Sequence, residues 1–556
     1  MEINIEIGTW QYNAGIVGLY NILKENSENI KIERDKFSFD SSALENFEEK
    51  YFNYLIGKYE KTLSWYKIVE QEDRLRNYLK NGVENLSKEE FENLNKYVKD
   101  TLKYYIKSNS YVAAYDLIQS EINPLEIEKS LKTVNLKKNE KIEDKKIELE
   151  DMINKSLLLI EYCKNGKKYL AGKNVIYTLI KNAWNGVSFL NAQTKEKDMY
   201  KDYKNYFIDN AVSYLNEDKE KYKYECFVCD NKIKNFENDF SFLNQTGFDV
   251  ARKPSHVWNF NNNIAMCPIC KLVYSCIPAG FNYFFGNGIF INANQSIEEL
   301  INVNNQIYSE IYKPQEVGTS SITYRALSEA MTQQTEESRK YELADIQMVR
   351  YENEKYYFNI LSKKMIKIIR ESKNDLNGII KAWYNEINTS FRVYEEVMKR
   401  ILDNQNLYTL IYKLLYYKIS RENDCHFNST HILKLLKINE RTMEGIKGME
   451  NTEKICKIEN PIEEAKNAGY FLKNKYIEKG TEHKISGICY RILNGIKTNN
   501  RAMVMDTILN CYMYVGSSVS RIIIEMLKDE DNMEKLGYAF VAGFMTEKSN
   551  GNGGNE

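Results

Sequence analysis

The chain has 556 residues, 43% of them hydrophobic and 28% charged, a composition typical of a globular protein with roughly three to four domains. Its net charge of −1 excludes a protein that is basic overall, so any nucleic-acid-binding surface must be a local patch. Ten cysteines and no evident signal peptide favour a reducing cytoplasm over a disulfide framework. The most apolar region, 272–291, is interrupted by Pro278 and three glycines, which argues against a membrane span.

The N-terminal residues predict a small mixed element. Residues 2–7 alternate isoleucine with polar residues, the pattern of a half-buried strand, and 30–39 alternate in the same way. Between them, 10–23 carry one apolar helical face, on which Gly15 and Gly18 allow close packing.

Residues 41–215 are mostly helical in pattern, and Pro124 is their only proline. The apolar run 174–190 predicts a core helix with Trp184 inside it. The charge-dense segment 137–150 is typical of a solvated helix face or a linker. Together with the N-terminal element this makes a predicted domain, 1–215.

Two CxxC pairs, separated by 37 residues, dominate the segment 216–300. Two residues between paired cysteines let a tight turn aim both sulfurs at one ion, which predicts a structural Zn²⁺ site with no open position for a catalytic water. The four predicted ligands are Cys226, Cys229, Cys267 and Cys270. The alternative is two unrelated pairs of buried or redox-active thiols. Cys276 and His256 are spare candidates, although Cys276 is more typical of a small buried hydrophobe.

The residues between the two CxxC pairs include Arg252 and Lys253, beside His256 and Trp258. Cations on a loop held by a metal can reach phosphates or groove edges, and a solvated loop is the alternative. Farther on, Asn287-Gly288 between apolar runs predicts the turn of a hairpin. We therefore expect 216–300 to be a zinc-stapled, β-containing insert.

The remainder of the chain predicts further helices. The helical middle region, 301–436, has a polar loop around 318–321 and helices from about Tyr356 to Ser420. Its core candidates are Ile366, Ile369, Ile379, Ile380 and Trp383. A glycine- and proline-containing hinge, 437–462, opens a C-terminal helical bundle, 437–548, and the tail 549–556 is disordered by composition. The predicted fold is thus mainly α.

Residues 466–521 contain nine basic and three acidic residues in a chain whose net charge is −1. Lys484 and Arg491 are seven residues apart, so they share one helical face, away from an isoleucine stripe. A basic helical face suits a phosphate backbone, and lysines balanced by acidic neighbours are the alternative. The candidate nucleic-acid contacts here are Lys484, Arg491, Lys497, Arg501 and Arg521.

The common catalytic motifs are absent. The four histidines occur in no HExxH motif or His-Asp dipeptide, and the phosphate-binding loop, GxGxxG and GxSxG motifs do not occur. Asp424, Cys425 and His426 are adjacent and cannot all point at one substrate atom from a regular element. We therefore expect a protein that is not an enzyme.

The paired CxxC motifs in mid-chain, the run NVIYTLIKNAWNGVSFLN before them, and two C-terminal segments carry a family resemblance. The C-terminal segments are ISGICYRILNGIKTNNRAMVMDTILNCYMYVG and LGYAFVAGFM. On these features the chain resembles the CXXC–CXXC family of CRISPR-associated proteins, the large subunit of type I-B Cascade effector complexes.

The resemblance implies a cytoplasmic, antiviral function with crRNA, double-stranded target DNA and other Cascade subunits as partners. Such a subunit holds the 5′ end of the guide RNA, reads the protospacer-adjacent motif (PAM) and helps to open the duplex. The completed R-loop then recruits a separate helicase–nuclease. The C-terminal bundle resembles the small subunit, which lines the path of the displaced strand. The rival hypothesis is a zinc-stapled helical protein of another class, either a nucleic-acid-processing enzyme or an assembly scaffold.

Overall fold

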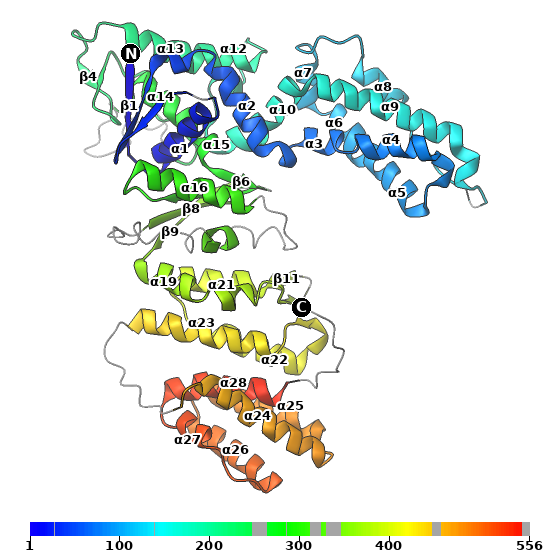
Figure 1. Cartoon of the computed structure of the whole chain (residues 1–556), viewed down its shortest axis with the longest axis vertical. Helices are drawn as coiled ribbons and strands as arrows, with labels where there is room; N and C mark the ends of the chain where they lie inside the picture. Colours follow the sequence, from blue (N-terminus) through cyan, green and yellow to red (C-terminus); the bar gives the residue numbers. More distant parts are fainter. Residues whose placement is uncertain are drawn as a thin grey trace. The chain divides into compact units, whose positions relative to one another are not determined.

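The computed structural model describes residues 1–26, 28–137, 139–246, 264–284, 286–311, 324–329, 346–387, 389–447 and 458–546. The chain divides into two compact units, the first made of 1–305 and 348–358, the second of 306–347 and 359–556 (Figure 1). Both consist mainly of helices with small sheets, which confirms the predicted fold class. Several predicted features lie outside the described residues, namely the loop at 318–321, most of the hinge, the tail, and Arg252, Lys253, His256 and Trp258.

The first unit begins with a three-stranded antiparallel sheet, in the order β1-β3-β2. Its strands are β1 (Glu2–Glu6), β2 (Ile30–Ile32) and β3 (Lys36–Asp40). The prediction of one strand over 30–39 was wrong, because the chain reverses there. The polar residues 33–35 form a turn closed by a 2.8 Å hydrogen bond from the Glu33 N–H to the Lys36 carbonyl.

Helix α1 (Trp10–Glu25) crosses α14 (Pro268–Ser275) and α15 (Ile277–Gly280) at the centre of this unit. A Cβ atom on Gly18 would lie 2.0 Å from the Cys276 carbonyl oxygen, and one on Gly280 would lie 1.9 Å from the Ala14 carbonyl oxygen. The helix backbones therefore touch, as the glycines of α1 predicted.

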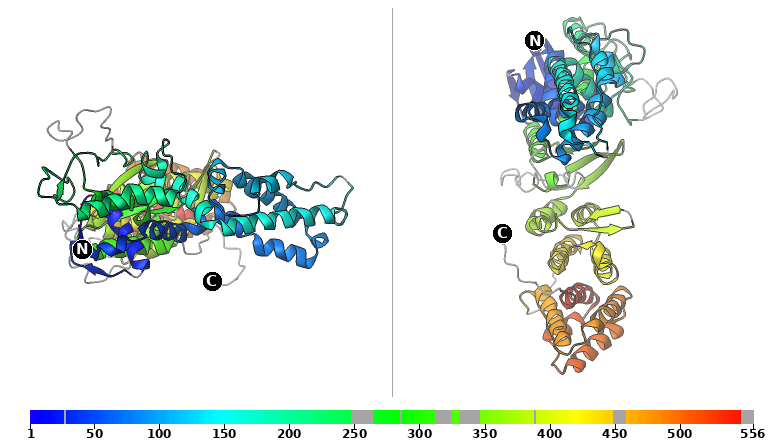
Figure 2. Two further views of the ribbon diagram at one scale, coloured as in Figure 1. Left: turned by 90° about the horizontal axis from the view of Figure 1, so that it is seen from above. Right: turned by 90° about the vertical axis from the view of Figure 1, so that its right-hand side faces the viewer.

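Helices of very different lengths make up most of the first unit. Figures 1 and 2 show α4, α5, α8 and α9 extending together away from the part that holds α1 and α14. The helices between residues 47 and 216 are α2 (Phe47–Tyr59), α3 (Ser64–Val69), α4 (Glu72–Asn81), α5 (Lys88–Lys96), α6 (Lys103–Ile106), α7 (Asn109–Tyr115), α8 (Pro124–Ser130), α9 (Lys146–Asn165), α10 (Lys167–Val175), α11 (Lys181–Ala183), α12 (Met199–Tyr203) and α13 (Asp209–Asn216).

Trp184 belongs to the core, but its predicted place inside a helix was wrong. Helix α11 ends at Ala183, and Trp184 has extended backbone angles and bridges to Leu243. Its indole is fully buried, and its Nε1 donates a 3.1 Å hydrogen bond to the Ser275 carbonyl at the end of α14. The helix ends where the indole reaches this acceptor.

A four-stranded sheet, in the order β6-β7-β8-β9, follows α15, and α16 (Ile297–Ile311) follows its first hairpin. The strands are β6 (Asn282–Phe284), β7 (Asn287–Asn292), β8 (Ile346–Glu352) and β9 (Lys355–Leu361). The hairpin was predicted, but its turn was misplaced. Phe284 pairs with Asn287, and Gly286 has φ +81°, so the turn precedes Asn287-Gly288.

The second unit contains a small sheet, β11-β10-β12, and a helical body. Helices do not resume at Tyr356 as predicted, because 355–361 form β9 and the first helix begins at Lys363. The four isoleucine core candidates are buried, and Trp383 is half-buried in β10. The elements are α19 (Lys363–Glu371), α20 (Lys373–Asn377), β10 (Trp383–Glu386), β11 (Thr389–Arg392), α21 (Val393–Leu402), α22 (Tyr408–Ser420), β12 (Cys425–His426), α23 (Ser429–Lys447), α24 (Pro461–Glu478), α25 (Ile485–Lys497), α26 (Arg501–Val515), α27 (Arg521–Met526) and α28 (Glu530–Phe544).

The C-terminal helices pack around α28, whose residues are mostly buried. Helices α24 and α28 cross closely, since a Cβ on Gly469 would lie 2.0 Å from the Phe540 carbonyl oxygen. The middle helices α22 and α23 also pack on α28. The predicted domain boundary at 437 falls within α23, and independent folding of the chain beyond it stays a prediction.

None of the helices in the described ranges has the length and apolar character needed to cross a bilayer.

Candidate metal centre and basic groove

The structure brings the four predicted ligands together. The Sγ atoms of Cys226, Cys229, Cys267 and Cys270 all lie within 4.8 Å of one another, and those of Cys229 and Cys267 are 3.7 Å apart. Zn–S bonds of 2.3 Å in a tetrahedron separate the sulfurs by about 3.8 Å. The cluster therefore has the dimensions of a four-thiolate metal site and can hold a metal ion.

The first CxxC pair lies in a turn between β4 (Tyr224–Glu225) and β5 (Lys232–Ile233). The Cys226 N–H donates to the Asn231 carbonyl at 2.8 Å and closes the turn. Asp230 adopts φ +58° just after Cys229, a left-handed conformation that aspartate tolerates better than most residues. The turn directs both sulfurs to the same side.

The second CxxC pair begins a helix. Cys267 is the N-cap of α14, Pro268 fills the first helical position, and the Cys267 sulfur accepts the Cys270 N–H at 3.4 Å. A helix N-terminus carries partial positive charge, which favours the thiolate form of cysteines placed there. The Phe227 N–H donates to the Ala265 carbonyl at 2.9 Å and ties the two pairs together.

Each of the four sulfurs has a hydrogen-bond donor. The Cys226 sulfur accepts the Cys267 N–H at 3.1 Å, and the Cys229 sulfur accepts the Asn231 side-chain amide at 3.2 Å. The Tyr12 hydroxyl lies 3.4 Å from the Cys270 sulfur. Burial and the neighbouring Cys270 sulfur raise the pKa of Tyr12 well above its usual value, so the phenol keeps its proton and can donate it to the thiolate. Such outer contacts orient metal ligands and spread their charge.

The opposite pKa shifts of the clustered thiols are also compatible with a bound divalent cation. Hydrogen bonds from the neighbouring thiols strongly lower the pKa of Cys226, whereas the hydrogen bonds that Cys270 gives and its burial raise the pKa of Cys270. Four adjacent thiols therefore do not all ionise by themselves. A bound dication supplies the positive charge that four thiolates need.

Helix α14 links the metal centre to the core of the first unit. It is buried along its length, and the Ser275 carbonyl at its end accepts hydrogen bonds from the Tyr51 hydroxyl at 3.0 Å and from Trp184. The part of the predicted insert that contains α14 therefore belongs to the core of the first unit. The turn with Cys226 and Cys229 is joined to it through the cysteine cluster.

Within the described ranges, no other cysteine joins the cluster. Cys276 is buried outside the cluster, and burial raises the pKa of its thiol to about 12, as expected of a small apolar residue. In β12, the His426 ring stacks on Trp383 with ring centroids 3.6 Å apart, and the neighbouring Cys425 pairs with Tyr384.

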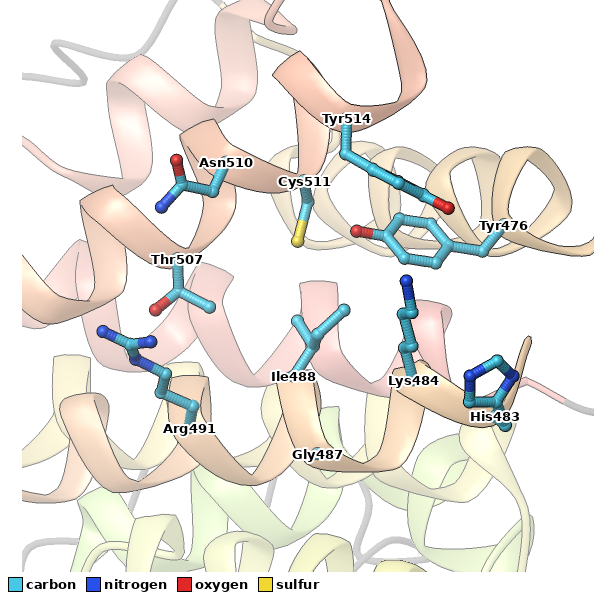
Figure 3. A pocket seen from close by; sticks show the side chains of 10 residues that line it. All are labelled: Tyr476, His483, Lys484, Gly487, Ile488, Arg491, Thr507, Asn510, Cys511 and Tyr514. Atoms are coloured by element: carbon cyan, nitrogen blue, oxygen red, sulfur yellow. The ribbon is translucent and has the colours of Figure 1, made fainter. Parts of the chain in front are cut away.

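A groove of about 530 Å³ lies between α25 and α26 in the second unit. Figure 3 shows Lys484 and Arg491 pointing from α25 toward α26, with Ile488 between them. The two cations therefore share one face, as their spacing predicted. This face is not separate from the predicted isoleucine stripe, because Ile488, which belongs to that stripe, lies between the two cations (Figure 3). The groove is lined by Tyr476, His483, Lys484, Gly487, Ile488, Arg491, Thr507, Asn510, Cys511 and Tyr514.

The predicted basic residues differ in their surroundings. The Lys484 Nζ lies 5.0 Å from the centre of the Tyr514 ring, and Arg491 is exposed and forms no ion pair within the described ranges. Lys497 lies over the Tyr412 ring, while Arg501 and Arg521 are exposed at the first positions of α26 and α27, and these three do not line the groove. Balanced lysines also occur, since Lys466 pairs with Glu463 and Lys475 with Glu478.

Sequence reasoning missed several residues at both sites. Asn231 lies two positions after Cys229, so a local search for donors beside the ligands could have found it. Tyr12 is 258 residues from Cys270, and no local pattern connects the two. Gly487 and Asn510 line the groove without any signal in the basic pattern.

Comparison with known proteins supports a relationship at the metal centre. Residues 219–282 match a family described as CRISPR-associated protein (Cas_CXXC_CXXC). The match covers the turn, both CxxC pairs, and α14 and α15. No curated protein and no solved structure matches the chain.

Proposed function

We propose that this chain is the large subunit of a type I-B Cascade effector complex and acts in CRISPR defence in the cytoplasm. In this function it holds the 5′ end of the crRNA, reads the PAM on target DNA and supports R-loop formation. A separate helicase–nuclease then cleaves the DNA, so the chain itself acts without catalysis. Its metal is a structural Zn²⁺ on Cys226, Cys229, Cys267 and Cys270.

The observation that carries the proposal is the four-cysteine centre within the segment that matches the CRISPR-associated family. A closed set of four thiolates suits Zn²⁺ in a structural role, because no coordination position is left for a reacting water. The metal would tie the turn that holds Cys226 to the buried helix α14. It would also fix the two ends of the segment that carries Arg252 and Lys253.

The exposed cations of the second unit support a contact with a nucleic-acid strand. Lys484 and Arg491 line one groove, and Arg501 and Arg521 are exposed at helix starts. Cations on a protein surface replace the counterions of a phosphate backbone, so binding through them weakens as the salt concentration rises.

Reconstitution tests the proposal. The chain, the other Cascade subunits and a crRNA are co-expressed, and binding of a labelled duplex that carries the matching target and PAM is measured. The expected result is a stable complex that binds this duplex and loses affinity when the PAM or the guide is changed. A chain that joins no such complex, or that cleaves nucleic acid alone with added metal ions, would overturn the proposal in favour of a scaffold or an enzyme.

Elemental analysis tests the metal assignment separately. We expect one zinc ion per purified, folded chain. A folded protein without any metal would contradict the assignment, whatever the outcome of the reconstitution.

A further inference from the structure

Gly487 is an unusual glycine. It lies inside α25, where glycine costs about 1 kcal/mol relative to alanine. A Cβ there would meet no atom within 4 Å. Apart from Gly57 in α2, the other helical glycines whose surroundings the structure describes are closely packed, because a Cβ would approach a neighbouring atom closer than 3.0 Å. These are Gly15, Gly18, Gly172, Gly280, Gly469, Gly495, Gly537 and Gly543.

No packing contact therefore explains Gly487, but its position does. It lines the groove between α25 and α26, whereas Gly57 of α2, which also faces open space, does not line this groove. Glycine lets a ligand approach a helix backbone closely, which any side chain would prevent. Together, the cavity and the missing side chain point to a ligand.

The chemistry of the groove restricts that ligand. Its floor includes the half-buried Ile488 and the buried Cys511 and Tyr476. Lys484 and Arg491 stand on either side of Ile488 (Figure 3), about 10 Å apart along α25 at 1.5 Å per residue. The ligand must therefore place an apolar surface between two negative groups.

The opposite wall offers polar groups. Asn510 is exposed at the groove, and its amide can both donate and accept a hydrogen bond. The cavity of about 530 Å³ lies within the range of small-ligand sites, about 300–1,000 Å³. A nucleotide within a strand has a flat, largely apolar base with hydrogen-bonding edges and a phosphate on each side.

We propose that the groove between α25 and α26 is a subsite for one nucleotide of a single strand. Its base lies against Gly487 and Ile488, and its flanking phosphates contact Lys484 and Arg491. The base edge faces Asn510. The inference deepens the proposed function and rests on it, because it specifies how the second unit holds a strand. DNA and RNA share this chemistry, and the test distinguishes them.

The test uses the full-length chain and labelled single-stranded oligonucleotides, with binding measured by fluorescence anisotropy. One oligonucleotide carries normal bases and its counterpart carries abasic positions. Since stacking of one base contributes about 1–3 kcal/mol, we expect the abasic strand to bind the wild-type chain at least about five-fold more weakly. Equal affinities would overturn the base subsite and leave only attraction to the backbone. Parallel DNA and RNA strands show which nucleic acid is preferred.

The matched variants are Gly487→Leu and Gly487→Ala. The leucine fills the groove and leaves every charge in place, so it should weaken binding about ten-fold and abolish the difference between normal and abasic strands. The alanine adds one methyl group where the base would lie and meets no protein atom, so it should weaken binding measurably but less than the leucine does. Circular dichroism and thermal unfolding verify that both variants fold. Equal binding by the two variants would contradict the proposal, as would a wild-type chain that binds neither strand.

The charge variant Lys484→Ala/Arg491→Ala should reduce the salt dependence of binding, because two phosphate contacts are lost. An unchanged salt dependence would contradict the two phosphate contacts. The subsite and the proposed function fail separately. A Gly487→Leu chain that binds single strands normally refutes the subsite, even if it assembles with crRNA and the other subunits. A chain whose binding depends on the base but which joins no such complex refutes the proposed function.

Discussion

The metal centre of the first unit and the groove of the second differ in how their polar groups are held. At the metal centre, every sulfur has a hydrogen-bond donor within 3.4 Å, and three of the four cysteines are buried. In the groove, Lys484 and Arg491 are exposed on flexible side chains. The first arrangement stabilises the fold once an ion binds. The second leaves cations available to a ligand and contributes little to folding.

The glycines of the two regions show the same difference. Gly18 and Gly280 let helix backbones touch behind the metal centre, whereas Gly487 faces open space in the groove. We therefore expect changes at the metal centre to affect mainly stability and changes in the groove to affect mainly binding. The following variants test that division.

Cys267→Ser should have the largest effect. It removes a metal ligand but leaves a serine that can still cap α14, so the effect reports the loss of the ligand. A structural zinc site contributes on the order of 10 kcal/mol in small peptides. We expect this variant to lose its zinc. Because α14 is buried in the core, we also expect the melting temperature of the whole first unit to fall strongly, and not only the turn with Cys226 and Cys229 to unfold. Cys276→Ser makes the same chemical change at a buried cysteine outside the cluster and should retain one zinc per chain. Equal zinc contents in the two variants would contradict the ligand assignment.

Gly280→Ala should cost about 3 kcal/mol, at the upper end for overpacking, because its Cβ would lie 1.9 Å from a backbone carbonyl that cannot move aside. Chemical denaturation measures the free energy of unfolding of the first unit in each variant. Gly57→Ala, in the open on α2, is the control and should not destabilise the chain. If both variants unfold at the same denaturant concentration, the close crossing of α1 and α15 does not stabilise the unit.

Tyr12→Phe should weaken zinc retention about ten-fold, because outer contacts of metal ligands contribute about 10–100-fold in affinity. The variant keeps the ring and its packing and removes the hydroxyl beside the Cys270 sulfur. Competition with a chelator measures the change. Tyr20→Phe, also in α1, serves as the control because no sulfur lies at its hydroxyl within the described contacts. Equal zinc release by the two variants would show that the Tyr12 hydroxyl does not support the metal.

Gly487→Ala should have the smallest effect on stability and the opposite sign, a gain of about 0.5–1 kcal/mol from helix propensity. Gly495→Ala, in the same helix, should destabilise, because its Cβ would lie 2.7 Å from the Val504 side chain. Thermal unfolding of the second unit measures both changes. A loss of stability in Gly487→Ala would mean that this glycine is required by the fold rather than by a ligand.

Local sequence was sufficient to predict that the four cysteines of the CxxC pairs form one cluster. The two-residue spacing in each CxxC pair is a property of a single turn or helix start, so no distant residue is needed to recognise it. The shared face of Lys484 and Arg491 was predictable for the same reason, since helical periodicity depends only on spacing. By contrast, the hairpin turn was misplaced, because strand pairing and not the Asn-Gly signal set the register around Gly286.

The sequence by itself determined the four-cysteine cluster, the mainly helical fold class and the shared face of Lys484 and Arg491 (Figure 3). Only the tertiary structure decided that Tyr12 meets a cysteine 258 residues away, that Trp184 ends a helix, and that Gly18 is packed while Gly487 is open. The physical reason is that these properties depend on atoms from distant segments. A hydrogen bond or a steric contact exists only once packing has brought both partners together, whereas spacing along one turn is already present in the chain.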